Sequence, residues 1–599
     1  MQRDNHATGK DFREDGKKIS LRWLAFACVI FAAIACRHFY PTLRDPARYQ
    51  YGNADAYLNT AILAWNNKSI DRGDFGELSE APIYYPAKRV KFLSETLLGH
   101  MWLAYPAWKL TGSHIATYNI TFIAEAFLTG IAVFLLLSSL TGARALSLAI
   151  AAVMLSGTMN AQLQIVALQW AVLAILFAIR LWRFSLWRDA IGLAASGTMA
   201  IYSCGYWGMF TPVVVAAVWT VLFIAKRKAP SFRWIIRVIV VIALTGAAVF
   251  PLMWNYAKVQ QEYGLERKHA SRFKPQLPRF DNIRFPFAKT ETRPIFTVKQ
   301  EKPETPGNPE TVEDGEARKK ELEKAIEKSK AERDRIPPGC FVLLIPWAAG
   351  FYLLIRKKAS NAKLTWSLMI TSMLCLWFAL AGKSGPYYLL YQIPGFSGLR
   401  AAFRWMHLFY VLEAGIAALV LSSLLRSKPR LGAAATLLLL AFALLVSGPV
   451  ESVIDTRLPK QECYEYLEQC EPGAVLSLPL PVHSTQYIFT VRSLYQLEHE
   501  HPMLLGYTGY RPPLQGEIFH RLTNAPITDE LCNKLALTGV RYVVIDRLTG
   551  GSRRRAEEIR RLRVPEIIFD GGGQIVARLP VLPVISDRGK LLNVWRNDR

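Results

Sequence analysis

The hydrophobic residues of this 599-residue chain are gathered in long runs instead of recurring at a helical or strand period. Runs such as 131–137, 213–225, 235–252 and 431–446 carry few or no charges. A helix needs about 20 mostly apolar residues to cross a bilayer. The pattern therefore predicts a polytopic α-helical membrane protein of about eleven spans, at 21–39, 117–140, 145–161, 164–182, 190–206, 208–225, 234–254, 339–355, 364–382, 403–425 and 431–449.

The polar gaps between these runs predict the orientation of the spans. Short gaps are basic, as in Lys226–Lys228, Arg356–Lys358 and Arg426–Arg430, and short basic loops mark the cytoplasmic side of a plasma membrane. With the N-terminus inside, the three long polar segments all lie outside. The expected organisation is a basic cytoplasmic tail (1–20), a transmembrane module (21–254) with an outer loop (40–116), an outer charged and proline-rich loop (255–338), further transmembrane helices (339–449) and an extracytoplasmic domain (450–599).

Segment 95–111 is apolar enough to be mistaken for a span. Counting it would invert every later loop and place the basic clusters outside. We therefore predict an interfacial or re-entrant helix there, with Trp102, Tyr105 and Trp108 at headgroup level. The alternative is a true span balanced by another miscounted one.

The region after the last span alternates helical and strand patterns. Helices are expected at 459–470, 529–537 and 554–562, strands at 474–480 and 540–546, and a hairpin over 566–579. This order predicts a small α/β domain.

The net charge of +25 first suggests nucleic acid, but the charge lies mainly in the short loops between spans. The C-terminal region holds 19 Lys+Arg and 18 Asp+Glu, and is nearly neutral. We therefore expect no nucleic-acid partner. No metal site is predicted, although a divalent ion is possible: His499 and His501 lack an evident third ligand, and an irregular loop is the simpler interpretation.

Candidate chemistry gathers in the outer loops. Asp55 and Glu95 are the candidate catalytic carboxylates. The candidate substrate-binding residues are Asn53, Tyr84, Tyr85, His100, Tyr387, Arg400 and Arg404. A carboxylate at a membrane surface can deprotonate a hydroxyl, and arginine beside a glycine-rich backbone suits a phosphate. The alternatives are helix caps for Asp55 and Glu95, interfacial packing for His100 and headgroup contact for Arg400.

The sequence at these residues resembles the GT-C-type membrane glycosyltransferase-like proteins, a group of polyprenyl-phosphate-sugar-dependent enzymes and uncharacterised bacterial relatives. The resemblance rests on Asp55 with Ala61–Trp65, Ile83–Pro86, Leu93–Glu95 and Gly385–Arg400, together with 539–544. It implies that Asp55 is the catalytic carboxylate of the first outer loop. The paired acidic motif common in that group is absent, since Asn53 and Ala54 precede Asp55.

These observations lead to one hypothesis and two alternatives. The hypothesis is an inverting glycosyltransferase that moves a sugar from a lipid-linked polyprenyl-phosphate donor to a glycan, lipid or protein acceptor, with Asp55 as general base. The first alternative is a non-enzymatic transporter or flippase for a lipid-linked glycan. The second is an envelope glycan-binding protein, whose Tyr507, Tyr510 and Trp595 would stack on sugar rings.

Overall fold

The computed structural model describes most of the chain and allows the predicted elements to be tested. It covers residues 19–52, 54–158, 162–226, 230–264, 291–294, 347–354, 361–379, 387–393, 395–399, 401–450, 452–481, 488–548, 551–571 and 573–596. Asn53, Arg400 and nearly all of the 255–338 loop lie outside these ranges.

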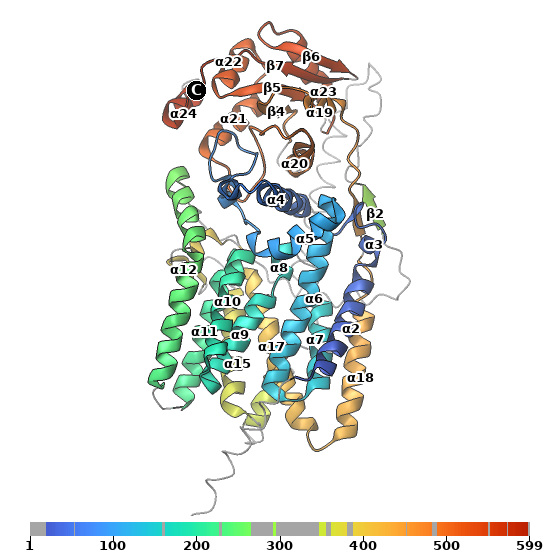
Figure 1. The fold of residues 1–599 in the computed structure, drawn as a ribbon, viewed down its shortest axis with the longest axis vertical. Coiled ribbons are helices and arrows are strands. Elements are labelled where there is room, and N and C mark those ends of the chain that lie inside the picture. Colours follow the sequence, from blue (N-terminus) through green and yellow to red (C-terminus); the bar gives the residue numbers. More distant parts are fainter. Residues whose placement is uncertain are drawn as a thin grey trace, which may run out of the picture.

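A bundle of long apolar helices forms one half of the molecule (Figure 1). Its described helices are α2 (Leu21–His38), α6 (His114–Thr141), α7 (Arg144–Thr158), α8 (Leu163–Val166), α9 (Gln169–Phe184), α10 (Trp187–Ser203), α11 (Gly205–Lys226), α12 (Phe232–Tyr263), α15 (Ala362–Ala379), α17 (Trp405–Leu425) and α18 (Pro429–Val446). Caps define several ends: the Ser113 and Ser231 hydroxyls accept N–H groups of the first turns of α6 and α12, and Gly142 ends α6 with φ +71°.

The bundle confirms a multi-pass membrane protein. Within the described residues, eight helical segments are long and apolar enough to cross a bilayer, with α8 and α9 taken together. α7 and α10 match two further predicted spans but are shorter, at 15 and 17 residues. Of the predicted span 339–355, only residues 347–354 are described, and they are helical.

Segment 95–111 does not form a span. Its helix α5 (Met101–Thr111) has 11 residues, a length of about 16 Å, and Gly112 ends it with φ +65°. Together with α4 (Ala54–Asp71), α5 lies between the bundle and the C-terminal domain (Figure 1). We call this side of the bundle the domain end.

A small sheet links the two halves. Its order is β1-β3-β2, in which β3 (Ser452–Asp455) pairs antiparallel with β1 (Tyr49–Gln50) and parallel with β2 (Glu291–Pro294). The strand that leads into the C-terminal domain is thus paired with a strand from the first outer loop.

The C-terminal domain is the expected small α/β domain. Its sheet has the order β4-β5-β7-β6, with β4 (Ala474–Leu478) parallel to β5 (Val540–Ile545), and β7 (Gln574–Arg578) antiparallel to both β5 and β6 (Glu566–Gly571). The expected helices are found as α19 (Glu462–Leu467), α22 (Asp529–Leu537) and α23 (Ser552–Arg560). Three helices were not predicted: α20 (Ile488–His499), α21 (Pro513–Asn524) and α24 (Arg588–Arg596).

Asp455, the last residue of β3, makes the stability of the β1-β3-β2 sheet depend on pH. Arg48 and Arg457 bond its carboxylate, with Nη2–Oδ2 distances of 2.9 and 2.7 Å. Burial opposes ionisation, but these hydrogen bonds prevail and lower the pKa of Asp455 below its ordinary value. A lowered folded-state pKa stabilises the fold above the ordinary carboxylate pKa, and this stabilisation is lost as the pH falls.

We therefore expect Asp455→Asn to lower the melting temperature of the full chain in detergent by about 2 °C at neutral pH. The difference from wild type should shrink below about pH 4, where the wild-type carboxyl also becomes protonated. Asp570→Asn removes an exposed pair with Arg560 and serves as the control, with little expected effect. An Asp455→Asn difference that does not depend on pH would contradict this account.

Candidate active site

The site is built around Asp55, at the domain end of the bundle. Asp55 lies in the first turn of α4, half-buried. A carboxylate there is favoured by the helix dipole. Because α4 begins at Ala54, Asp55 lies inside the helix and is not its N-cap, contrary to one alternative from the sequence.

A glutamine that sequence reasoning missed joins Asp55 to Arg404. Gln162 is the N-cap residue of α8, and its Nε2 donates to Asp55 Oδ2. Its Oε1 accepts from Arg404 Nη2 at 2.6 Å. The only sequence signal was a polar pair, Gln162 and Gln164, at the junction of two apolar runs.

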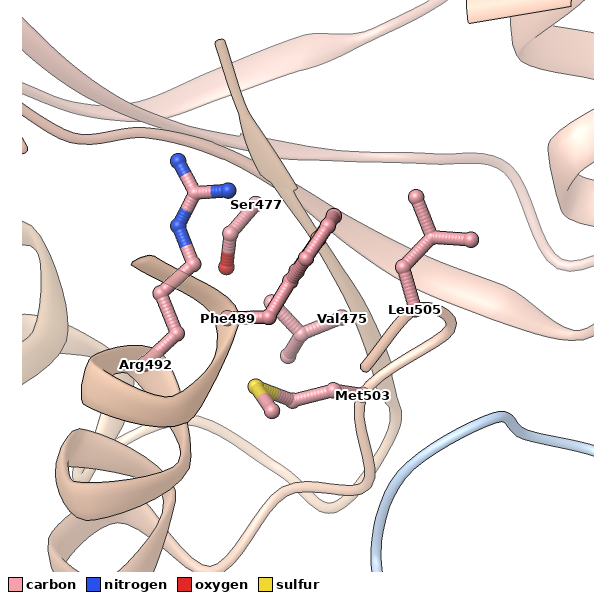
Figure 2. A pocket seen from close by; sticks show the side chains of 6 residues that line it. All are labelled: Val475, Ser477, Phe489, Arg492, Met503 and Leu505. Carbon is pink, nitrogen blue, oxygen red and sulfur yellow. The ribbon is translucent and has the colours of Figure 1, made fainter. Parts of the chain in front are cut away.

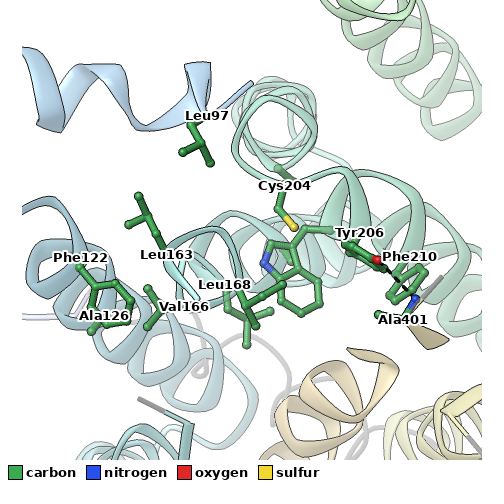
Figure 3. Packing of buried hydrophobic residues seen from close by; sticks show 14 of the residues in the cluster. Leu97, Phe122, Ala126, Leu163, Val166, Leu168, Cys204, Tyr206, Phe210 and Ala401 are labelled. Carbon is green, nitrogen blue, oxygen red and sulfur yellow. Dashed lines mark hydrogen bonds between the residues drawn. The ribbon is translucent and has the colours of Figure 1, made fainter. Parts of the chain in front are cut away.

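Arg404 directly precedes α17, and among the described residues only some of the hydrogen-bond donors of its guanidinium have partners. Its guanidinium carbon lies 4.1 Å from the ring centroid of Tyr206 in the first turn of α11. The Tyr206 hydroxyl accepts from Ala401 N at 3.3 Å, the contact drawn as a dashed line in Figure 3. Arg404 Nε is buried and has no hydrogen-bond partner within the described ranges. One donor of a fixed cation is therefore left for another molecule.

Glu95 lies near Arg404 but is already engaged. Its Oε2 accepts the N–H of Gly205, the first residue of α11, at 3.0 Å. Burial raises the pKa of Glu95, while that hydrogen bond and the charges of Arg404 and His100 act in the opposite direction. Glu95 thus caps the start of α11. The sequence analysis gave helix capping as the alternative role of Glu95, but the helix that it caps begins 110 residues later in the chain. We define Asp55, Glu95, Gln162 and Arg404 as the Asp55–Arg404 cluster.

His100 lies beneath this cluster, sealed from solvent. Its ring nitrogens lie 2.8 Å from Glu125 Oε1 and 3.0 Å from the carbonyl oxygen of Ser203, and both side chains of the His100–Glu125 pair are fully buried. Gln169 Nε2 donates to the other Glu125 oxygen. His100 therefore ties three helices together, as the packing alternative expected.

The three candidate tyrosines make hydrogen bonds to residues outside the Asp55–Arg404 cluster. Gln515 of α21 donates to the carbonyl oxygens of Tyr84 and Tyr85 at 2.8 and 3.0 Å, so these residues anchor the outer loop to the C-terminal domain. Tyr387 is 1% exposed, and its hydroxyl donates to the carbonyl oxygen of Leu399 at 3.0 Å. Asn53 and Arg400 lie outside the described residues.

The C-terminal domain contacts α4 directly. Trp65 Nε1 donates to Gln496 Oε1 at 2.8 Å, and Lys68 Nζ pairs with Glu500 Oε1 at 2.7 Å, both across the contact with α20. The helix that carries Asp55 is therefore fixed at its far end by the domain.

A small pocket lies within the C-terminal domain (Figure 2). It is lined by Val475, Ser477, Phe489, Arg492, Met503 and Leu505. The charge of Arg492 is matched by Asp546, at an Nε–Oδ2 distance of 2.7 Å. Arg492 Nη1 has no hydrogen-bond partner within the described ranges, as is true of Arg404 Nε, but the Asp546 carboxylate already balances the charge of Arg492. Since the rest of the lining is mostly apolar, the Asp55–Arg404 cluster is the better candidate for chemistry.

Trp595 and His501, which the sequence suggested for sugar stacking and metal binding, are both buried. Trp595 is 4% exposed and donates to Thr538 Oγ1 at 3.2 Å, so it belongs to the domain core and does not present a face to a sugar. His501 is buried, with Nε2 2.9 Å from the carbonyl oxygen of Leu467. Across the described parts of the chain, no three His, Cys, Asp or Glu side chains are grouped to hold one metal ion.

Comparison with known proteins gives similarity to solved structures only. No protein-family model matches the chain, and no curated protein matches it. An Archaeoglobus fulgidus oligosaccharyltransferase tethered to an acceptor peptide matches at 12% identity and TM-score 0.45, over 88% of this chain and 69% of that one. ArnT from Cupriavidus metallidurans matches in its apo state and bound to undecaprenyl phosphate, at 11% and 10% identity and TM-score 0.45, over 95% of this chain and 99% of that one.

The oligosaccharyltransferase and ArnT are similar to this chain in fold alone. Identities and TM-scores at this level carry no activity from one protein to another.

Proposed function

We propose that this chain is a membrane glycosyltransferase that moves a sugar from a polyprenyl-phosphate donor to an acceptor hydroxyl at the domain end of the bundle. The observation that carries the proposal is the placement of a carboxylate, Asp55, and a guanidinium, Arg404, on the two ends of one amide. A base and a phosphate-binding cation are the two groups that such a transfer needs.

The reaction is a single displacement. The acceptor oxygen attacks the anomeric carbon, the bond from that carbon to the phosphate oxygen breaks, and the phosphate leaves with the electron pair. Asp55 takes the proton of the attacking hydroxyl. Attack from the face opposite the leaving phosphate inverts the configuration of the sugar.

Arg404 is assigned the leaving phosphate. Phosphate needs no general acid, but the negative charge that develops on it is stabilised by a fixed cation. Arg404 is stacked on Tyr206 and retains a buried Nε donor with no partner in the described part of the chain. A charge-assisted hydrogen bond from this group to a phosphate oxygen fits the geometry of arginine.

The proposed orientation places the domain end outside the cytoplasm. The end of α9 and the turn from α17 to α18 lie at the bundle end opposite the C-terminal domain (Figure 1). The end of α9 carries Arg180 and Arg183, Arg426 follows α17, and Arg430 is in the first turn of α18. Basic residues at that end favour a cytoplasmic position for it. The donor's tail would then lie in the outer half of the membrane, beside helices whose apolar side chains are exposed.

Arg404→Gln tests the phosphate assignment. In full-length protein reconstituted in lipid nanodiscs, we expect this substitution to weaken binding of undecaprenyl phosphate by about 10–100-fold, because one charge-assisted hydrogen bond is worth about 1.5–3 kcal/mol. Arg426→Gln is the matched control, since it removes the same charge from the exposed far end of α17. Equal affinity of Arg404→Gln and wild type would contradict the assignment.

Turnover tests the proposed reaction class. Wild-type protein incubated with undecaprenyl-phosphate-linked hexoses and pentoses, and with a membrane extract as acceptor, should release undecaprenyl phosphate and label an acceptor. Movement of the lipid across the membrane without any glycosyl product would instead support a transporter.

A further inference from the structure

The amide of Gln162 lies between the two charged groups of the proposed reaction. It comes from the loop before α8, whereas Asp55 comes from α4 and Arg404 from the residue before α17. Three segments that are far apart in sequence therefore meet at one neutral side chain. This arrangement rests on contacts that the sequence does not predict.

The chemistry of the partners fixes which end of the amide faces which group. An ionised carboxylate only accepts hydrogen bonds, and a guanidinium only donates them. The Gln162 NH₂ must therefore face Asp55, and its oxygen must face Arg404. Gln164 Nε2 also donates to the Gln162 oxygen, at 3.3 Å, and Asn59 Nδ2 donates to the Gln164 oxygen at 3.0 Å.

An amide between the two charges serves the reaction better than a direct ion pair. A direct contact would use the donors of Arg404 that a phosphate needs, and would lower the basicity of Asp55. A neutral amide contacts both side chains and itself neutralises neither charge. The length of one glutamine side chain then sets the separation of the base from the cation.

We propose that Gln162 is the positioning residue of this site, which holds Asp55 and Arg404 at the separation required for transfer from a phosphate-linked donor. This inference rests on the proposed function. In the proposed reaction Gln162 contacts neither the anomeric carbon nor the proton that Asp55 removes from the acceptor. It acts by holding Asp55 and Arg404 in position.

Several titratable or charged groups surround this amide within the described residues. Asp55 faces it from α4 and Arg404 from the start of α17. Tyr118 of α6 interacts with the charge of Asp55, and Glu95 with that of Arg404. A carboxyl placed at position 162 would therefore meet one cation and one nearby anion.

Two substitutions separate positioning from packing. Gln162→Leu removes the hydrogen bonds with Asp55, Arg404 and Gln164 at similar volume. It should lower kcat about 10²-fold, because a displacement of about 1 Å can cost that much. Binding of undecaprenyl phosphate should stay within about threefold of wild type, since Arg404 keeps its charge and its contact with Tyr206.

Gln162→Glu supplies a pH readout. A protonated carboxyl can donate to Asp55 and accept from Arg404 as the amide does, whereas an ionised one repels Asp55 and pairs with Arg404. The kcat of Gln162→Glu, divided by wild type at each pH, should therefore rise as the pH falls from about 8 to about 5. Gln261→Glu, an exposed site at the end of α12, is the control and should give a flat ratio.

The outcomes distinguish this inference from the function on which it rests. Full turnover by Asp55→Asn would overturn the proposed function itself. Loss of turnover in Asp55→Asn, with both Gln162 variants equal to wild type, would overturn only the role of Gln162. Equal, pH-independent losses in Gln162→Leu and Gln162→Glu would assign the residue to packing and would also overturn it.

Discussion

Asp55→Asn should lower kcat for sugar transfer by about 10³-fold, within the range of about 10²–10⁴ that general-base assistance contributes. Asparagine has the same shape and can still accept the hydrogen bond from Gln162, but it cannot take the acceptor's proton. The loss should therefore fall on the chemical step. Binding of undecaprenyl phosphate should change little, because the proposal assigns the phosphate to Arg404.

Asp71→Asn is the matched control for this experiment. Asp71 is the last residue of α4, and its carboxylate pairs with Lys109 at the surface. Both substitutions remove one negative charge from the same helix, at opposite ends. Single-turnover rates that fall equally in the two variants would show that the effect comes from α4 as a whole, and would remove Asp55 from the mechanism.

The second large effect is expected in the C-terminal domain. Asp546 follows β5 and is fully buried with Arg492 of α20. Its Oδ2 lies 2.7 Å from Arg492 Nε, its Oδ1 lies 3.0 Å from Arg492 Nη2, and the Tyr464 hydroxyl donates to Oδ2 at 2.8 Å. Asp546→Asn would leave a buried guanidinium with no balancing charge, at a cost of about 3–5 kcal/mol in the free energy of unfolding.

Hydrogen exchange of backbone amides in the full chain measures this loss of stability within the C-terminal domain. Amides of β5 and β7 should exchange about 150- to 5,000-fold faster in Asp546→Asn than in wild type, which is the same free energy expressed as a rate ratio. The double variant Arg492→Met with Asp546→Leu should recover much of the protection, because it removes both charges together. Protection in Asp546→Asn equal to wild type would contradict the assignment of this pair as a main support of the domain.

The sequence predicted what depends on composition and local periodicity. The spans follow from runs of apolar residues, so α6, α9, α11, α12, α17 and α18 lie close to the expected ranges. α22 and β5 were predicted almost to the residue, because one shows a helical period behind a capping Thr528 and the other is a β-branched run. α20 was not predicted. Nearly all of its residues are buried, and its polar side chains, such as Arg492 and Gln496, contact other parts of the protein instead of solvent.

The site was predicted only in part, because its contacts join residues far apart in the chain. Asp55 and Arg404 were candidates from the sequence, but their link through Gln162 spans 107 and 242 residues. The contact between Tyr84 and Gln515 could not be predicted for the same reason, because the two residues lie 431 positions apart in the sequence. Local patterns reveal which residues are polar at a membrane edge. They do not reveal which polar residues are occupied by the protein itself.

The contact of α4 with α20 joins the helix bundle to the C-terminal domain, so removing the domain should affect the bundle. α4 begins at the helix bundle with Asp55 and is pinned near its other end by Gln496 and Glu500. The orientation of α4, and with it the position of Asp55, depends on the contacts at both ends of this helix. A shortened protein that stops after α18 would retain the described bundle helices but lose the contacts that hold the far end of α4, the helix that carries the proposed general base Asp55. We therefore expect the proposed activity to require the C-terminal domain as well as the bundle.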